Sequence, residues 1–283
     1  MRFTKMEGCG NDYIYFNCFE ETIDDPAALA VRLSDRHFGI GGDGIVLIKP
    51  SDKADFFMDM YNLDGSRGRM CGNAIRCVGK YVYDHKMTDK KELAVETLSG
   101  IKYLTLHVTD GAVSTVTVDM GEPKTDAASL PLDTSFLKGI DTDKPIIGYS
   151  LAALARTHRF TFVSMGNPHA VTFVDDPFAV PLEEIGPAYE NHSIFPERAN
   201  IEFVHVTDRT HIDFRVWERG SGETFACGTG ACASAYACIL NGFTEDEVNV
   251  KMRGGSLVIR YDRTSGHIFM TGPATAVFTG EIS

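Results

Sequence analysis

The alternation of apolar and polar positions predicts many short strands and few helices. In the first half, runs rich in branched and aromatic residues predict strands, and apolar residues three and four positions apart predict helices. The predicted strands of this half are 13–17, 45–48, 56–61, 101–108 and 112–119, and the predicted helices are 26–36 and a segment after Cys71 that ends near His85.

The second half repeats this order of elements. Small residues at Ala231, Ala235 and Cys238 fall on one side of a predicted helix, which indicates a helix closely enclosed by other backbone. The predicted strands are 160–163, 170–174, 201–206, 211–217, 248–252, 257–261 and 267–270, and a further helix is predicted over 181–190. The segment 123–145 has few large apolar residues and is the predicted place of a junction between two domains.

A short phrase occurs twice, as Cys71-Gly72-Asn73-Ala74 and as Cys227-Gly228-Thr229-Gly230. Each phrase precedes a predicted helix, and a thiol at a helix start meets unpaired N–H groups that lower its pKa and favour thiolate. Two such thiols, one from each half, could face one carbon from opposite sides. One would remove a proton while the other supplies one, which inverts a stereocentre.

Two simpler explanations of these cysteines compete with the two-thiol hypothesis. A free cysteine is most often a small buried apolar residue, although packing alone gives no reason for a glycine and a helix after each thiol. A zinc site is the second, but on a helix Cys71 and Cys77 would lie about 240° apart and Cys227 and Cys232 about 140° apart. Neither pair converges on one ion, so the sequence predicts no metal.

The segment 39–44 matches the dinucleotide fingerprint G-x-G-x-x-G in letters alone. That fingerprint must follow a strand and open a helix, whereas here a predicted helix precedes it and a predicted strand follows. We interpret it as a tight loop.

Composition narrows the class of protein. The 283 residues are 43% apolar and 23% charged, and 27 basic against 39 acidic residues give a net charge of −12. This balance argues against nucleic acid or an anionic membrane surface as a general partner and favours a small molecule. Seven cysteines, no signal segment before Cys9 and no apolar run of about 20 residues predict a reduced cytoplasmic protein.

Polar residues gather at predicted strand ends and turns near the two thiols. Any one asparagine is more often a turn residue, and a Glu-Arg pair more often a solvated surface pair. Arg219 stands out because it precedes Cys227 by eight positions, and a guanidinium suits bidentate binding of a carboxylate. The set comprises Asn11, Asn62, Asn167, His169, Asn200, Glu218 and Arg219.

Several segments of this sequence resemble the diaminopimelate epimerase family. The resemblance is carried by 8–12, 62–66, 69–77, 165–169, 217–220, 226–232 and the closing 270–273, and therefore covers essentially the whole chain. The block from Glu218-Arg219-Gly220 to Ala226-Cys227-Gly228-Thr229-Gly230-Ala231 is its most specific part.

The resemblance implies an epimerase that interconverts LL- and meso-diaminopimelate without a cofactor, in the synthesis of lysine and peptidoglycan precursors. It implies Cys71 and Cys227 as the two bases, supported by His169 and Glu218. Backbone at Gly72-Asn73 and at Gly228-Thr229 resembles the cradle for the reacting carboxylate. Substrate-holding positions are Asn11, Asn62, Asn167, Asn200, Glu218 and Arg219.

The fold that the resemblance implies is α/β, of the α+β type. Two similar domains, each a mostly antiparallel curled sheet around a central helix, would comprise 1–120 with 272–283, and 121–271. A homodimer is expected. Gly44 stands where some members have glutamine, Ala74 replaces a common glycine, and Phe278 stands where some members place a tyrosine at the dimer contact.

Two rival functions stay open at this point. One is racemisation of another amino acid such as proline or histidine within the same superfamily. The other is a non-catalytic thiol protein that binds metal or senses oxidants.

Overall fold

The computed structural model describes residues 1–282 and divides into two compact units. Unit 1 is Met1–Asp119 together with the chain from Thr271 onward, and unit 2 is Met120–Met270. The segment 123–145, predicted as the junction, lies inside unit 2, because Leu130 and Leu132 are buried in that unit's core. The predicted domain ranges, as independently folding bodies, stay a prediction.

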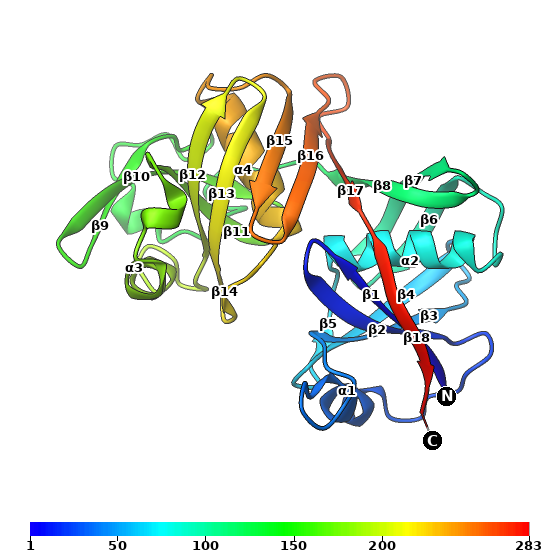
Figure 1. Cartoon of the computed structure of the whole chain (residues 1–283). Helices are drawn as coiled ribbons and strands as arrows, with labels where there is room; N and C mark the ends of the chain where they lie inside the picture. The colour runs from blue at the N-terminus through cyan, green and yellow to red at the C-terminus, as the bar shows by residue number, and fades with distance from the viewer. Residues whose placement is uncertain (283) are drawn as a thin grey trace. The chain divides into compact units, whose positions relative to one another are not determined.

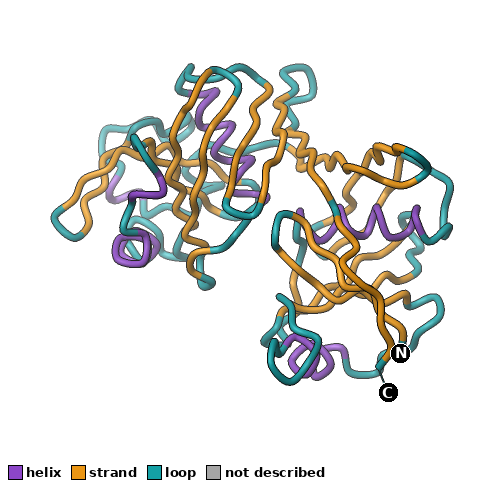
Figure 2. Tube along the Cα trace, in the orientation of Figure 1, coloured by secondary structure: helices purple, strands orange, loops and turns teal. Residues whose placement is uncertain are grey.

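Unit 1 is a curled sheet around one helix (Figures 1 and 2). Strand pairing runs β18–β1–β2–β3–β4–β6–β7–β8, and helix α2 packs on β1, β2, β7 and β18. The strands are β1 (Arg2–Gly8), β2 (Asn11–Asn17), β3 (Gly44–Lys49), β4 (Phe56–Asn62), β5 (Arg67–Gly68), β6 (Glu92–Thr97), β7 (Gly100–Thr109), β8 (Ala112–Gly121) and β18 (Thr275–Glu281), and the helices are α1 (Pro26–Ser34) and α2 (Gly72–Asp84).

Unit 2 repeats this plan around helix α4. Its strands pair in the order β9–β10–β11–β12–β13–β15–β16, and α4 packs on most of them. The strands are β9 (Tyr149–Ala153), β10 (Arg156–Ser164), β11 (Pro168–Phe173), β12 (Asn200–Asp208), β13 (His211–Glu218), β14 (Gly222–Glu223), β15 (Glu247–Met252), β16 (Gly255–Tyr261) and β17 (Ile268–Pro273), and the helices are α3 (Leu182–Glu190), α4 (Gly228–Leu240) and the short 3₁₀ turns η1 (Thr134–Phe136) and η2 (Pro177–Ala179).

The two units share the order of strand directions. From β1 through β2, β3, β4 and β6 to β7 the pairings are antiparallel, parallel, antiparallel, parallel and antiparallel. The series from β10 through β11, β12, β13 and β15 to β16 repeats that order. Helices α2 and α4 therefore occupy equivalent places, which confirms the predicted α/β fold of two similar halves.

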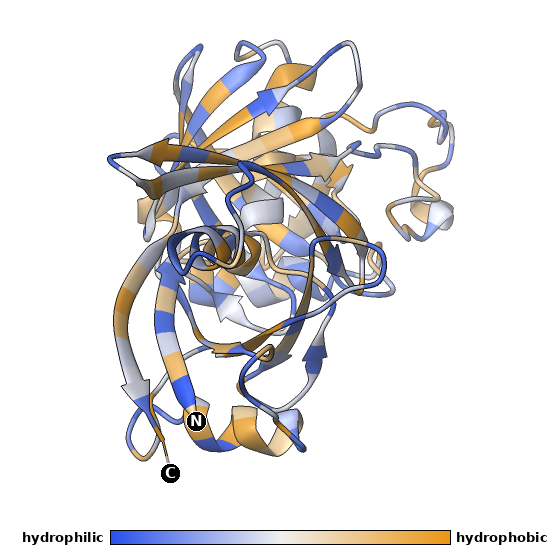
Figure 3. Ribbon diagram, turned by 90° about the vertical axis from the view of Figure 1, so that its right-hand side faces the viewer, coloured by the Kyte–Doolittle hydropathy of each residue, from blue (hydrophilic) through white to orange (hydrophobic). Residues whose placement is uncertain are grey.

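The two central helices pack against their sheets in different ways. In α2 the stripe Ile75, Val78 and Val82 is fully buried, as an amphipathic helix requires. Helix α4 packs against β10, β11, β12, β13, β15 and β16, and its small buried residues, such as Ala231, Cys232 and Ala235, allow these strands to approach closely. Strands in Figure 3 alternate between hydrophilic and hydrophobic residues, as half-buried strands do.

The sequence patterns missed several elements. Strands β1, β6, β9 and β18 were not predicted, and α1 ends at Ser34 instead of Arg36. The earlier end has a local cause. The N–H groups of Ile40 and Gly41 bond back to the carbonyl of Leu33, and the Asp35 carboxylate accepts from the next loop residues.

The segment 39–44, interpreted as a tight loop, is a loop over 39–43, and Gly44 begins β3. The loop joins α1 to β3, and the Lys5 ammonium bonds the carbonyl of Gly41 within it. No helix in the described part of the chain is both long and apolar enough to cross a bilayer.

Candidate active site

Each of the two predicted thiols is the N-cap residue of a central helix. Cys71 precedes α2 with extended backbone and its sulfur accepts the Ala74 N–H at 3.5 Å. Cys227 precedes α4 in the same conformation and accepts the Gly230 N–H at 3.4 Å. A sulfur thus takes the place that serine or aspartate oxygen usually fills at a helix start. Cys71 belongs to unit 1 and Cys227 to unit 2.

In unit 1, the hairpin between β1 and β2 brings Asn11 to Cys71. Cys9 and Gly10 have φ values of +55° and +82°, as a two-residue hairpin turn requires. Asn11 follows directly, and its Oδ1 lies 3.1 Å from the Cys71 Sγ. The thiol donates to this oxygen, because a side-chain carbonyl is only an acceptor.

A buried arginine holds this corner of unit 1 together. Arg76 on α2 is fully buried and donates to the carbonyl of Gly72 at 3.1 Å and to Asn73 Oδ1 at 2.9 Å. It also reaches the carbonyl of Pro273 at 3.1 Å and the sulfur of Cys9 at 3.7 Å. The Asn73 side chain is therefore engaged by Arg76, which leaves backbone as the part of Gly72-Asn73 that suits a carboxylate cradle.

Asn62 lies at the end of β4 and braces a turn. Its Nδ2 donates to Ser66 Oγ at 3.0 Å, and its own N–H bonds the carbonyl of Ser66. Opposite it on β3, Gly44 has φ +153°, and a Cβ there would lie 2.0 Å from the carbonyl oxygen of Tyr61. A side chain at position 44 would clash with this backbone.

In unit 2, a chain of polar contacts ends at Cys227. The Asn167 Nδ2 lies 3.4 Å from Thr229 Oγ1, and that hydroxyl lies 3.6 Å from the Cys227 sulfur. At the other end, Asn167 Oδ1 lies 3.0 Å from His169 Nε2. The structure therefore joins three predicted site residues to the thiol.

A carboxylate that sequence reasoning missed completes this chain. Glu202 on β12 is fully buried, and its Oε1 lies 2.5 Å from His169 Nδ1. Burial raises the pKa of Glu202, while the charge and hydrogen bond of His169 oppose that rise. Asn167 and Glu202 thus hold the two ring nitrogens of His169 from opposite sides and fix the orientation of the imidazole.

The electrostatics of Cys227 differ from the prediction. Burial raises its pKa well above 9.0, the nearby carboxylates of Glu218 and Glu202 raise it further, and the Thr229 hydroxyl and Gly230 N–H only partly oppose them. The expected lowering of the pKa was therefore wrong for Cys227 in the free protein, although the helix N–H group acts in the expected direction. Desolvation of a thiolate outweighs the helix N–H groups.

Alkylation should report this directly. Because the pKa of Cys227 is raised, the thiol form prevails at neutral pH, and labelling of Cys227 by iodoacetamide should keep accelerating above pH 9.0. Peptide mass spectrometry across a pH series measures it, with Cys227→Ser to identify the peptide. A rate that levels off near neutral pH would contradict the assignment.

Of the remaining predicted residues of unit 2, Asn200 and Arg219 are joined by a hydrogen bond. Asn200 Nδ2 donates to the carbonyl of Pro168 at 3.0 Å, and its Oδ1 accepts the N–H of Arg219 at 2.9 Å. The Arg219 guanidinium donates to the carbonyl of Glu197 at 3.0 Å. Glu218 accepts the hydroxyl of Thr224. Asn200 thus serves the chain as a brace between β11 and the end of β13.

Comparison with known proteins shows the family of this chain. The family profile described as diaminopimelate epimerase matches residues 3–125 and 161–277. The diaminopimelate epimerase of Agathobacter rectalis is 57% identical over 282 residues, covering 100% of this chain and 99% of the relative. That of Acetivibrio thermocellus is 54% identical over 283 residues, covering 100% and 98%.

The chain belongs to the diaminopimelate epimerase family.

Solved structures with low sequence identity share the fold. A phenazine biosynthesis protein of the PhzF family from Bacillus anthracis matches with a TM-score of 0.71 at 16% identity, covering 100% of this chain and 99% of that one. A hydroxyproline epimerase from Agrobacterium vitis, solved with bound trans-4-hydroxy-L-proline, matches with a TM-score of 0.66 at 14% identity, covering 99% and 91%. These likenesses extend the two-unit fold beyond the family.

Proposed function

We propose that this chain is a diaminopimelate epimerase that uses two thiols. Cys71 and Cys227 act on one α-carbon, one removing a proton as thiolate and the other supplying one as thiol, with the roles exchanged in the reverse reaction. The observation that carries the proposal is the equivalent placement of both sulfurs as N-caps of the two central helices. Membership of the family supports diaminopimelate as the substrate.

The two helix starts supply what the chemistry demands. An amino acid α-proton is weakly acidic, and its removal leaves charge on the adjacent carboxylate. Backbone N–H groups at Gly72-Asn73 and Gly228-Thr229 are fixed donors at helix N-termini, where negative charge is favoured. Losing one such donor typically costs about 3 kcal/mol of transition-state stabilisation. The reaction then runs on the chain's own groups, without pyridoxal phosphate.

The polar residues of each unit take the remaining roles. Asn11, Asn62, Asn167 and Asn200 hold the substrate or the residues that touch it, and Glu218 with Arg219 binds the distal amino and carboxylate groups. His169 and Glu218 support proton transfer at the thiols. The raised pKa of Cys227 in the free protein suits its role as proton donor, and a partner base must take its proton before it can act as the base. Glu218 contributes directly to that pKa.

We infer a cytoplasmic homodimer. No disulfide joins any of the seven cysteines in the described part of the chain, and thiols stay reduced in a reducing compartment. On β18, residues 275–279 are exposed, and Val277 and Phe278 are 55% and 47% exposed. Exposed large apolar side chains on a strand suit a contact with a second copy.

Hydrogen exchange at the α-carbon tests substrate and chemistry together. The protein, with no added pyridoxal phosphate, should convert LL-diaminopimelate to the meso form in deuterated buffer. NMR should show deuterium at one of the two α-carbons, because the second centre is not processed in the same event.

The substrate controls are L-proline and L-histidine. Turnover of either in preference to diaminopimelate would replace the proposed substrate and keep the chemistry. An absence of α-proton exchange with all three would overturn the proposed function.

A further inference from the structure

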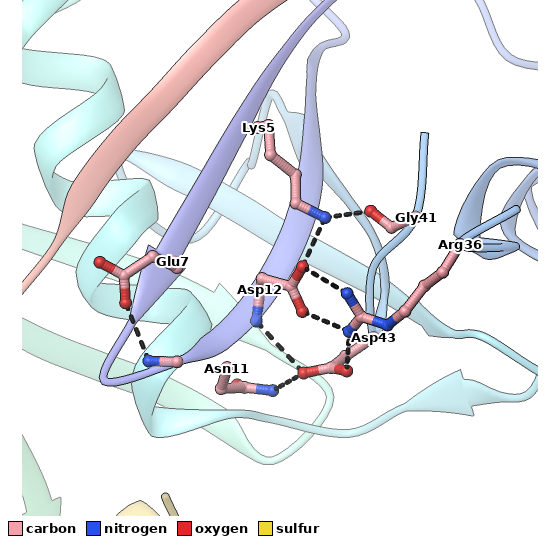
Figure 4. A network of polar contacts seen from close by, with 8 residues as sticks. Lys5, Glu7, Asn11, Asp12, Arg36, Gly41 and Asp43 are labelled. Atoms are coloured by element: carbon pink, nitrogen blue, oxygen red, sulfur yellow. Dashed lines mark hydrogen bonds and ion pairs between the residues drawn. The ribbon is translucent and has the colours of Figure 1, made fainter. Parts of the chain in front are cut away.

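A cluster of charged residues in unit 1 lies beside Asn11 and has no part in the mechanism above (Figure 4). Asp43, in the loop between α1 and β3, accepts the Asn11 Nδ2 at 2.6 Å and the Asp12 N–H at 3.2 Å through one oxygen. Its other oxygen accepts Arg36 Nη2 at 3.0 Å. Arg36 and Lys5 also both bind the Asp12 carboxylate.

These contacts fix which end of the Asn11 amide faces Cys71. A carboxylate only accepts hydrogen bonds, so the NH₂ group of Asn11 must point to Asp43. Its carbonyl oxygen then points away from Asp43, where the Cys71 sulfur lies 3.1 Å from it. An oxygen at that place accepts the thiol proton and opposes the thiolate.

We propose that Asp43 is a positioning residue that orients the Asn11 amide and thereby keeps Cys71 protonated in the free protein. The catalytic meaning rests on the proposed function, in which the protonated thiol is the proton donor. Burial raises the pKa of Asp43, the Asp12 carboxylate adds to the rise, and the Asn11, Asp12 and Arg36 donors oppose it.

The alkylation rate of Cys71 distinguishes the orientation of the Asn11 amide from the charge of Asp43 as the cause of the effect. In Asp43→Ala the Asn11 amide is free to turn its NH₂ group to the sulfur, which stabilises thiolate. Labelling of Cys71 by iodoacetamide should become about fivefold faster, since one hydrogen bond changes its preference between the two forms. In Asp43→Asn an oxygen still faces Asn11 and Asp12, and the rate should stay within about twofold of wild type.

The matched control is Asp55→Ala, which removes an aspartate of unit 1 bonded to Lys90 at 2.6 Å and to the Ala94 N–H at 2.8 Å, with no contact to Asn11. It should leave Cys71 labelling unchanged. Acceleration in both Asp43 variants would assign the effect to charge and overturn the orientation claim, and no acceleration in either would overturn it too.

If Asp43→Ala does not fold, NMR of the Asn11 side-chain amide in the wild-type protein tests the proposal instead. One side-chain amide proton of Asn11 should resonate downfield of free asparagine and exchange slowly with water, as a hydrogen bond to a carboxylate requires. A free-asparagine signature would overturn the proposal. If the variants show the expected alkylation rates but the wild-type protein does not turn over diaminopimelate, the proposed function alone would be overturned.

Discussion

Cys71→Ala and Cys227→Ala should each lower kcat/KM for epimerisation at least about 10³-fold, because general acid–base groups typically contribute 10²- to 10⁴-fold and each direction needs both. Steady-state assay from the LL and the meso isomer measures the loss. The fold should survive, since each change removes one sulfur at a helix start. Circular dichroism and thermal unfolding check this.

Matched controls are available among the other cysteines. Cys18→Ala changes a half-buried free thiol of unit 1, and Cys238→Ala changes a buried thiol within α4 whose pKa burial raises to about 12. Both should keep activity within a few-fold of wild type. Near-normal turnover in a folded Cys71→Ala or Cys227→Ala protein would refute the two-thiol chemistry.

Glu202→Ala should lower the free energy of unfolding by about 3 kcal/mol or more, because it leaves His169 without its buried partner. Both side chains are fully inaccessible, and Glu202 Oε1 lies 2.5 Å from His169 Nδ1. Replacing the lost carboxylate by water therefore costs free energy. Activity of the folded fraction should fall as well, since His169 orients Asn167 and, through Thr229, the Cys227 sulfur. Denaturant unfolding with parallel assay measures both effects.

Glu202→Gln distinguishes shape from charge. It keeps the volume and one acceptor, so stability should recover in large part, while the pH profile for kcat should change because a carboxyl group with a raised pKa is lost. Glu247→Ala, an exposed change on β15, should stay within about 0.5 kcal/mol of wild type. Equal stability of Glu202→Ala and wild type would contradict the buried pair.

Local signals predicted the elements around the thiols well. The stripe Ile75, Val78 and Val82 and the helix end at His85 follow from spacing alone, and α2 spans Gly72–Asp84 with His85 as its C-cap. Strand β6 was missed because the charged residues Lys90, Lys91 and Glu92 at its start hide the apolar alternation that predicts a strand. Its conformation is decided by its pairing with β4 and β7. Propensity is weak against such tertiary pairing.

The supporting residues of the site were harder to find. Glu202 is a lone carboxylate between Ile201 and Phe203 in a predicted strand, and a charged residue within such a run is a signal that sequence reading could have used. Asp43 carries no such signal. Its partner Asn11 is 32 positions away, and only the parallel pairing of β2 with β3 brings them together.

The thiol at α4 shows where a local rule fails. A helix start favours thiolate, and the Gly230 N–H does act in that direction at Cys227. The sequence did not reveal that Cys227 is buried and near two carboxylates, which together raise its pKa. Burial is a property of the assembled fold, so the direction of this shift required the structure.

Oxidative cross-linking tests most directly whether Cys71 and Cys227 serve one carbon. Mild oxidation of the wild-type protein, followed by peptide mass spectrometry, should yield a Cys71–Cys227 disulfide with loss of activity that a reductant restores, and bound diaminopimelate should slow its formation. Full activity after oxidation, or both sulfurs recovered free or joined to other cysteines, would contradict the two-thiol account.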